Sequence, residues 1–459
     1  MKRAAAKDLD RWIQGRDRKP LVLRGARQVG KTWLVRDLAA RSNLNLVEIN
    51  FERDPRLMRV FQGTDPVAVI SDLSIALGRE IDSRRSLLFL DEIQTAGEVL
   101  ARLRWFGEEL PHLPVIAAGS LLDLTLADHA FSMPVGRVAF YHVEPMSFDE
   151  YLRAHGQARL AMLLAGFDWT GALSETAHER AITWFRRYAM VGGMPALVAA
   201  DATGASARAV REGQRDLVAA YRADFSKYSG RMNRDVLDTV LDAAARSLGH
   251  KFVYARVGEG VKQHQTKRAI DLLAGARVIH LVKYSAANGL PLGGEVKDTF
   301  RKAALIDVAV FHALAGSPAE ERFPPWSALS PDVRGQLTDQ LAAQALRLGD
   351  DLSGDGPALH YWQREGGRPG EIDYLIQAGG RIVPVELKAG KAGAMKSLHQ
   401  FMFDKRLRRA LRLDENPPSR AEVSVTTTQG DAVKYELVGL PIYLAARARE
   451  LVGERSGRP

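Results

Sequence analysis

The sequence of 459 residues contains no cysteine, no apolar run of membrane-spanning length, and no H-E-x-x-H pair among its 11 histidines. The lack of cysteine excludes disulfides and thiolate metal sites, and it fits a reducing compartment. The lack of a long apolar run predicts no membrane span. The charged first ten residues also lack the apolar segment of a signal peptide. We therefore expect a cytoplasmic protein that does not contact a membrane.

Charge and composition are close to those of average soluble proteins. The chain has 64 basic and 55 acidic side chains, a net charge of +9, and a hydrophobic fraction of 46%. Large cores are therefore possible and wholesale disorder is not expected. The excess of positive charge permits a polyanionic partner but does not require one. The length predicts about three domains.

A glycine-rich loop carries the most specific motif. Residues 25–32 read G-A-R-Q-V-G-K-T and lie between an apolar run and a helical pattern that starts at Trp33. Glycines let backbone N–H groups wrap phosphates, the lysine adds a positive charge, and the threonine hydroxyl can hold Mg²⁺. The loop predicts that a nucleoside triphosphate binds to the following residues: Gly25, Ala26, Arg27, Gln28, Val29, Gly30, Lys31 and Thr32.

Short apolar runs alternate with helical patterns over the first 150 residues. After the run that precedes the loop, strands are expected at 44–51, 86–91, 115–120 and 138–143. Continuous apolar strands separated by helices predict a parallel sheet that is covered on both faces.

The expected strand 86–91 ends in Asp91, which Glu92 follows. Ligands of open α/β sheets bind at this carboxyl edge, so Asp91 could bind Mg²⁺ and Glu92 could polarise an attacking water. In the alternative interpretation, the two carboxylates only open a helix, where the helix dipole favours them.

Ser120 and Arg137 are two further candidates. Ser120 could contact the γ-phosphate or the attacking water, or it could cap the helix that follows. Arg137 could supply positive charge to the nucleotide of a neighbouring subunit, or it could be an ordinary surface arginine. The first role of Arg137 would require a homo-oligomer.

The motifs together resemble one family, the bacterial and archaeal AAA-type ATP-binding proteins with a C-terminal domain of uncharacterised function. The segments that carry the resemblance are 23–32, 88–94, 118–120, 136–137, 144–152 and 192–195. The resemblance implies ATP rather than GTP and the following roles: Lys31 and Thr32 on the nucleotide, Asp91 on Mg²⁺, Glu92 as catalytic base, Ser120 as sensor, and Arg137 as arginine finger.

The middle of the chain divides into a helical region and a unit that resembles a winged helix. After the ATPase domain, 1–152, the residues 153–228 show alanine, leucine and arginine at helical spacing, which suits a lid on the nucleotide domain. In the unit 229–315, residues 236–282 show the pattern of two helices followed by a strand over 275–282. The basic first half of 261–274 could contact nucleic acid, or it could be the solvated face of a protein-packing unit. Its candidate residues are Lys262, Gln263, Gln265, Lys267 and Arg268.

The last part, 316–459, contains an acidic hairpin. Asp373 lies in one expected strand, and Glu386 and Lys388 lie two apart in the next, so these two side chains share a face. Two carboxylates and a lysine can form a Mg²⁺ site for phosphodiester hydrolysis. Asp339, on the preceding helix, could add a ligand. The order of elements resembles the PD-(D/E)XK nuclease core.

Two questions stay open for this part. The carboxylates could form a catalytic site or an internal ion-pair network in a fold that does not cleave. The run 405–412, with five positive charges, is expected to form one short helix that either follows a phosphate backbone or is simply solvated.

We therefore expect an α/β protein: a P-loop parallel sheet with a helical lid, followed by a winged-helix unit and a PD-(D/E)XK-like α/β domain. The expected cofactors are ATP and Mg²⁺. The expected function is ATP hydrolysis that drives or gates a nuclease-like module on DNA or RNA. The alternative is an ATP-dependent switch that binds a protein partner through an inactive module.

Overall fold

The computed structural model describes most of the chain and divides it into two compact units. The described residues are 2–120, 122, 136–228, 232–364, 370–390 and 395–453. Unit 1 consists of 1–145 with the short segments 272–278 and 352–356, and unit 2 consists of 146–271, 279–351 and 357–459. In the described ranges, no helix is long and apolar enough to cross a membrane.

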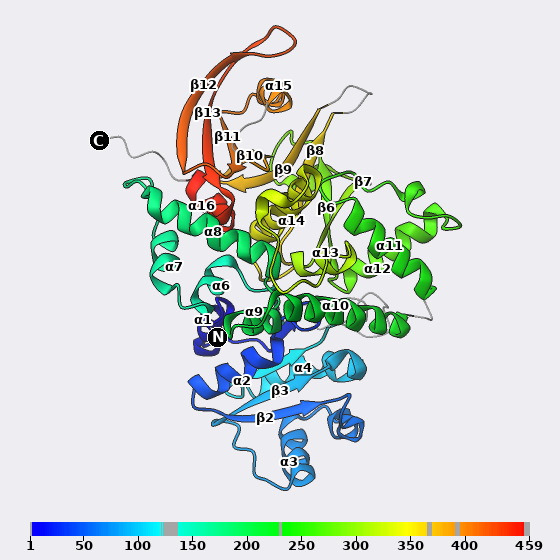
Figure 1. The fold of residues 1–459 in the computed structure, drawn as a ribbon. Helices are drawn as coiled ribbons and strands as arrows, with labels where there is room; N and C mark the ends of the chain where they lie inside the picture. Colours follow the sequence, from blue (N-terminus) through cyan, green and yellow to red (C-terminus); the bar gives the residue numbers. More distant parts are fainter. Residues whose placement is uncertain are drawn as a thin grey trace. The chain divides into compact units, whose positions relative to one another are not determined.

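Unit 1 is built on a parallel five-stranded sheet, which confirms the predicted parallel sheet and is consistent with a P-loop fold (Figure 1). The order is β2-β3-β4-β1-β5. The strands are β1 (Leu21–Arg24), β2 (Asn45–Asn50), β3 (Ser86–Asp91), β4 (Val115–Ala118) and β5 (Ala139–His142). Each overlaps a predicted strand. The prediction for β4 was two residues too long, since the strand ends before Gly119.

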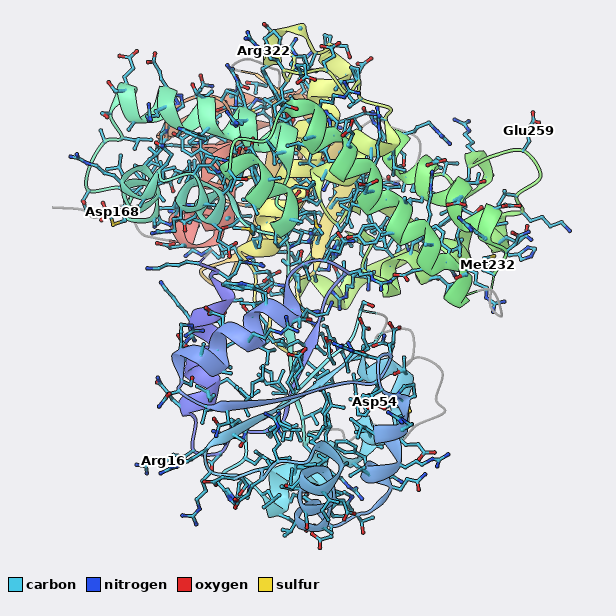
Figure 2. The ribbon with its side chains drawn as sticks, turned by 60° about the horizontal axis from the view of Figure 1, so that its bottom comes forward. Arg16, Asp54, Asp168, Met232, Glu259 and Arg322 are labelled. Atoms are coloured by element: carbon cyan, nitrogen blue, oxygen red, sulfur yellow. The ribbon has the colours of Figure 1, made fainter. Side chains whose placement is uncertain are left out.

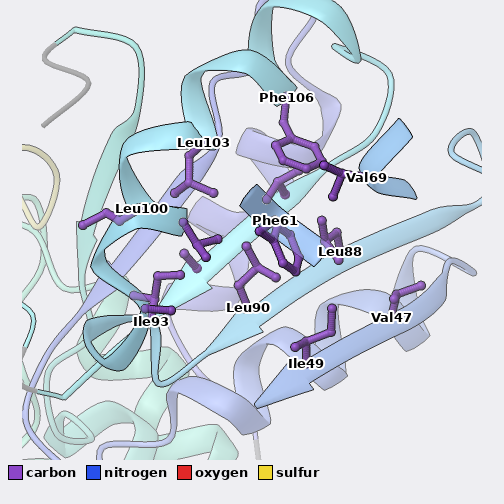
Figure 3. Packing of buried hydrophobic residues seen from close by; sticks show 14 of the residues in the cluster. Val47, Ile49, Phe61, Val69, Leu88, Leu90, Ile93, Leu100, Leu103 and Phe106 are labelled. Atoms are coloured by element: carbon purple, nitrogen blue, oxygen red, sulfur yellow. The ribbon is translucent and has the colours of Figure 1, made fainter. Parts of the chain in front are cut away.

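Helices cover both faces of this sheet. They are α1 (Ala5–Gln14), α2 (Lys31–Arg41), α3 (Pro66–Leu77) and α4 (Gly97–Glu109), with a 3-10 helix η1 at Pro55–Gln62. Figure 3 shows alternate strand side chains, such as Leu88 and Leu90, packed against Phe61 of η1 and Phe106 of α4. Burial of one such side chain contributes about 1.5–3 kcal/mol. Their neighbours Leu87 and Phe89 are buried too, which explains the continuous apolar run.

The first part of unit 2 is helical, as the alanine- and leucine-rich pattern predicts. The helices are α6 (Phe148–Ala154), α7 (Ala158–Ala165), α8 (Glu175–Val191), α9 (Pro195–Ala202) and α10 (Ala207–Asp224), followed by a 3-10 helix, η3, at Phe225–Tyr228. Ser147, Ser174 and Ser206 each cap a helix by accepting a hydrogen bond from the backbone N–H three residues on. The role of this region as a lid stays a prediction.

The two glycines between α8 and α9 are explained by a buried carboxylate. Asp307 accepts hydrogen bonds from the N–H of Gly193 at 2.8 Å and of Ala309 at 2.9 Å. Gly192 has φ 89, and a Cβ there would lie 2.1 Å from the Asp307 carboxylate. This close approach requires glycine, so Gly192 serves the packing of unit 2.

The rest of unit 2 forms a mixed eight-stranded sheet of order β12-β13-β11-β10-β9-β8-β6-β7 (Figure 1). The strands are β6 (Ile279–Ser285), β7 (Val296–Leu305), β8 (Leu359–Gln363), β9 (Glu371–Ala378), β10 (Arg381–Leu387), β11 (Arg409–Asp414), β12 (Ser419–Thr426) and β13 (Ala432–Pro441). The accompanying helices are α11 (Arg234–Arg246), α12 (Gln263–Gly275), α13 (Val308–Leu314), α14 (Pro331–Leu348), α15 (Lys396–Asp404) and α16 (Ala448–Gly453). This sheet therefore continues through position 315, where the sequence suggested a boundary.

Of the predicted elements of unit 2, one strand has different bounds and one helix is wrong. The strand expected at 275–282 begins only at Ile279, because α12 continues to Gly275 and Arg277 turns the chain with φ 60. The run 405–412 is not a helix: α15 ends at Asp404, and β11 starts at Arg409. Ala410, Leu411 and Leu413 are buried between β10 and β13, so the local charge pattern hid a central strand.

Candidate functional site

The phosphate-binding loop joins β1 to α2 with a backbone shape that few residues adopt. Gly25 has φ 143, and a Cβ there would lie 2.4 Å from the carbonyl oxygen of Val143. Gln28 has φ 67 and Gly30 has φ 95, where α2 begins. Ala26 and Val29 are fully buried, whereas the intervening Arg27 and Gln28 are more exposed. The loop therefore curls over the start of α2, where backbone N–H groups favour anions.

Lys31 is held inside this curl. Its Nζ donates hydrogen bonds to the carbonyl oxygens of Gly25 at 2.9 Å and Ala26 at 2.8 Å. Burial lowers the pKa of Lys31 to about 8, although Glu92 and Asp91 oppose this shift. An incoming phosphate would add negative charge next to the ammonium group and favour its protonated form.

The side chains of Thr32 and Asp91 meet at the carboxyl edge of the sheet. The Thr32 hydroxyl donates to Asp91 Oδ2 at 3.1 Å, although the two residues are 59 positions apart. Burial raises the pKa of Asp91, and the neighbouring Glu92 raises it further. A hydroxyl and a carboxylate are oxygen ligands of the kind that Mg²⁺ prefers.

Glu92 directly follows β3 and is held by a neighbour that the sequence did not single out. Its backbone has φ 53, an uncommon conformation for a residue with a side chain. Gln94 Nε2 donates to Glu92 Oε2 at 2.6 Å. The structure thus adds Gln94 as a residue that orients the candidate base. In the sequence it appears only as the last residue of the segment 88–94, which carries the family resemblance.

Ser120 and Arg137 lie in different surroundings. Ser120 is buried two residues after β4. Of the helix 121–126 that it could cap, only Leu122 is among the described residues. Arg137 is 63% exposed, and its Nη1 forms an ion pair with Glu108 Oε1 at 3.0 Å. Its side chain therefore has a partner within unit 1.

Arg3 is a second residue that was not predicted, and it contacts the phosphate-binding loop. It is buried, and its guanidinium donates to the carbonyl oxygens of Val29 at 2.8 Å and Glu144 at 2.7 Å. Position 3 lies in a charged N-terminal stretch just before α1, and nothing in that stretch indicates that this arginine is buried.

In unit 2 the predicted acidic hairpin is confirmed as β9 and β10. The register pairs Tyr374 with Val385, so Asp373 and Glu386 are the next pair along the two strands. Asp373 Oδ2 accepts from the N–H of Leu387 at 2.8 Å, and Lys388 Nζ donates to Glu386 Oε1 at 2.7 Å. Burial raises the pKa of both carboxyls. The three side chains predicted from spacing do gather at one end of the hairpin.

Asp339 and a buried lysine join this group. Asp339 Oδ2 accepts from the Tyr374 hydroxyl at 3.1 Å, and burial raises the Asp339 pKa to about 6. Lys302, only 1% exposed, forms an ion pair with Glu371 and also interacts electrostatically with Asp373 and Asp339. Sequence reasoning missed Lys302, because nothing around position 302 indicates that a lysine there is buried.

A cavity of about 300 Å³ opens beside these carboxylates. Asp339 and Asp373 line it, together with Gly249, His250 and Leu387. Over the described ranges, no three His, Asp or Glu side chains are already arranged as a metal site.

The basic residues predicted on a recognition helix lie at the start of α12. Lys262, Gln263, Lys267 and Arg268 are exposed there. Gln265 is half-buried, and its Oε1 accepts from the backbone N–H of Lys262 at 3.0 Å. Their side chains thus present positive charge to solvent, which both earlier interpretations allow.

Three family models match different parts of the chain. Residues 17–152 match a model described as "AAA domain". Residues 182–321 match a domain of unknown function (DUF8612), and residues 334–438 match a second one (DUF4143). The latter two descriptions assign no activity. Among curated proteins, none matches the sequence.

Solved structures show weak likeness. The Holliday junction branch migration motor RuvB of Thermotoga maritima has 16% identity and a TM-score of 0.26, with 64% of this chain and 91% of that chain covered. Drosophila ORC bound to DNA has 15% identity and a TM-score of 0.23, with 68% and 84% covered. Scores this low add nothing to the assignment. The match of 17–152, together with the parallel sheet and the loop at 25–32, makes this part of the chain a AAA-type P-loop domain.

Proposed function

We propose that the chain binds ATP with Mg²⁺ at the loop 25–32 and hydrolyses it with Glu92 as general base. The observation that carries this proposal is the meeting of Thr32 and Asp91 at 3.1 Å, directly beside Glu92. Thr32 lies on α2, Asp91 ends β3, and Glu92 follows it. In a P-loop ATPase, residues at these two places hold the metal ion and the attacking water.

Each side chain then has one task. The backbone of the loop and Lys31 bind the β- and γ-phosphates. The Thr32 hydroxyl and the Asp91 carboxylate hold Mg²⁺, which neutralises phosphate charge when bound. Glu92, held by Gln94, orients and deprotonates the attacking water, while buried Ser120 contacts the γ-phosphate. Arg137, which is largely exposed, serves as an arginine finger for a neighbouring subunit in a homo-oligomer, where it would exchange Glu108 for phosphate.

We further propose that ATP turnover gates a PD-(D/E)XK nuclease-like module in 316–459. The support is the gathering of Asp373, Glu386 and Lys388 at one end of the β9–β10 hairpin, next to a cavity. The raised carboxyl pKa values fit groups that a divalent cation would neutralise. DNA or RNA is then the substrate, and the exposed basic residues of α12, in the predicted winged-helix unit, would contact phosphates.

One observation favours the second candidate, a switch that binds a protein partner without cleavage. Lys302 already places an ammonium group among Glu371, Asp373 and Asp339. An internal cation can balance the carboxylates, so the group could be stable without a metal.

A cleavage assay separates the two candidates. Purified protein is incubated with labelled DNA and RNA, with and without ATP and Mg²⁺. The nuclease proposal expects Mg²⁺-dependent cleavage that Lys388→Ala abolishes and that Lys31→Ala uncouples from ATP. If the wild-type protein hydrolyses ATP but neither cleaves nor binds nucleic acid, the protein-binding switch becomes the better account.

A further inference from the structure

A second cavity of unit 2, of about 660 Å³, lies at the turn between β9 and β10. Three chain segments form its walls: the turn itself at 378–383, the segment 287–290, and the connection 405–409 between α15 and β11. Val452 and Gly453 close one side. The basic run that the sequence suggested to be a helix therefore forms one wall of a pocket.

All charged side chains that line this pocket are positive. Its lining contains five cationic side chains and, among the described residues, no carboxylate. The five are Arg381, Lys405, Arg406, Arg408 and Arg409. A concave surface of this composition raises the local concentration of anions.

Two of the five cations are held in place by neighbours. Lys405 Nζ donates to Asn288 Oδ1 at 2.6 Å. Arg409 forms an ion pair with Glu436 at 2.6 Å. Arg381, Arg406 and Arg408 are exposed, and the described part of the chain offers none of them an ion-pair partner. These three guanidinium groups are therefore available to a ligand.

The pocket lies away from the acidic group described above. Asp373 and Glu386 lie at one end of the hairpin, and the turn Gly379–Gly380 lies at the other end. About five residues of each strand separate them, or roughly 17 Å at the rise of a β-strand. The two sites do not share a lining residue. A phosphate bound in the basic pocket would therefore be a different group from a phosphate bound to a metal ion at the acidic site.

The residue types of the lining indicate which part of a ligand the pocket can bind. No aromatic side chain is among the described lining residues, so stacking on a base is not provided. Guanidinium groups bind phosphate oxygens in a planar, bidentate manner. The walls therefore suit closely spaced phosphates rather than bases.

We propose that this pocket binds closely spaced phosphates, as in the backbone of a nucleic acid strand, without regard to base sequence. The proposal goes beyond the proposed ATPase and nuclease functions and does not depend on either of them. Inorganic polyphosphate carries the same chemistry, and the experiment below separates the two sources.

The test is a binding titration of the full chain in EDTA, so that cleavage cannot occur. Every protein carries Lys31→Ala, which removes phosphate binding at the P-loop. A labelled single-stranded oligonucleotide of mixed sequence is titrated by fluorescence anisotropy at several salt concentrations. The test variant combines Arg406→Ala and Arg408→Ala. The control combines Arg256→Ala and Lys396→Ala, which removes two exposed positive charges from the same unit.

The test variant should bind about tenfold more weakly than the parent, and the magnitude of its log–log salt slope should fall by about 1.4. The control should behave like the parent. Equal binding by the test variant and the control overturns the proposal. The oligonucleotide would then respond only to the net positive charge of the protein and not to the arginines of this pocket.

Inorganic polyphosphate is titrated in parallel by calorimetry. In one outcome, the parent protein binds polyphosphate but not the oligonucleotide. If the test variant then loses polyphosphate binding and the control keeps it, the pocket is a polyphosphate site. If neither ligand binds the parent protein, the proposal is wrong.

Discussion

The guanidinium of Arg3 donates a hydrogen bond to the carbonyl oxygen of Val29, 26 residues further along the chain, at 2.8 Å. The same group reaches the carbonyl oxygen of Glu144. Arg3 thereby ties the phosphate-binding loop to the segment that follows β5. The loop's shape depends on a side chain that never touches the nucleotide in our proposal.

Arg3→Ala should weaken nucleotide binding by about tenfold, because two buried carbonyl groups lose a charged donor worth some 1.5–3 kcal/mol. A fluorescent ATP analogue measures the affinity. Arg16→Ala, at an exposed position labelled in Figure 2, is the control and should bind like the wild type. An unchanged affinity for Arg3→Ala would show that the loop keeps its shape without this support.

Gly25→Ala should abolish nucleotide binding. The added Cβ would lie 2.4 Å from the carbonyl oxygen of Val143, and φ 143 is unfavourable for alanine. Gly171 has no atom within 4 Å of such a Cβ, so Gly171→Ala should bind normally. Both are compared by calorimetry with ATP and Mg²⁺, after circular dichroism has confirmed that each variant is folded.

Glu92→Gln should reduce ATP turnover by at least about a hundredfold and leave ATP affinity nearly unchanged, because the amide cannot accept the proton of water. Phosphate release measures turnover, and calorimetry measures binding. Lys31→Ala is the contrasting variant and should lose binding itself. Turnover at the wild-type rate in Glu92→Gln would remove Glu92 from its proposed role.

Asp339→Asn should stabilise unit 2 at neutral pH in the absence of divalent cations. The folded-state pKa of Asp339 is about 6, above its usual value of 3.8, so the folded state binds this proton more tightly than the unfolded state. The stabilisation due to the protonated form is complete below about pH 4 and is lost as the pH rises through about 6.

Asparagine does not ionise, so the variant keeps that stability. Its free energy of unfolding should exceed that of the wild type by about 3 kcal/mol at pH 8, and the difference should disappear below about pH 4. Urea denaturation in EDTA at several pH values measures it. A difference that does not change with pH would contradict the prediction.

Asp201→Ala should destabilise unit 2 by about 3 kcal/mol, because it leaves buried donors without an acceptor. The Asp201 carboxylate accepts from Tyr151, His155 and Arg187 at 2.6–3.2 Å. Burial alone would raise its pKa, but these hydrogen bonds lower the pKa well below the usual value. Chemical denaturation compares the variant with Asp216→Ala, an exposed control on α10. Equal stability of the two variants would contradict the prediction.

The nucleotide domain was largely predictable because its signals are local. Glycines at 25 and 30, a lysine and a threonine lie within eight residues, and the six residues of β3 end in Asp91, which Glu92 follows directly. The hairpin of unit 2 was predictable for the same reason, since a Gly-Gly turn separates two apolar strands.

The features that could not be predicted depend on contacts between residues that are distant in sequence. β11 looked like a charged helix because the strands that bury Ala410 and Leu411, β10 and β13, flank it only in the folded sheet. Lys302 looked like a surface lysine, because its partner Glu371 lies 69 positions away. Burial of charge is a property of the tertiary structure, and no short window of sequence reports it.

The strand order of unit 2 has a consequence for how this chain can be shortened. β8 pairs in parallel with β6 and antiparallel with β9, and so joins the two halves of the sheet. A fragment that stops at residue 315 would contain β6 and β7 but would leave one edge of β6 open. Open strand edges recruit other chains. Such a fragment should therefore self-associate, whereas fragments that retain 357–453 keep the strand that closes this edge.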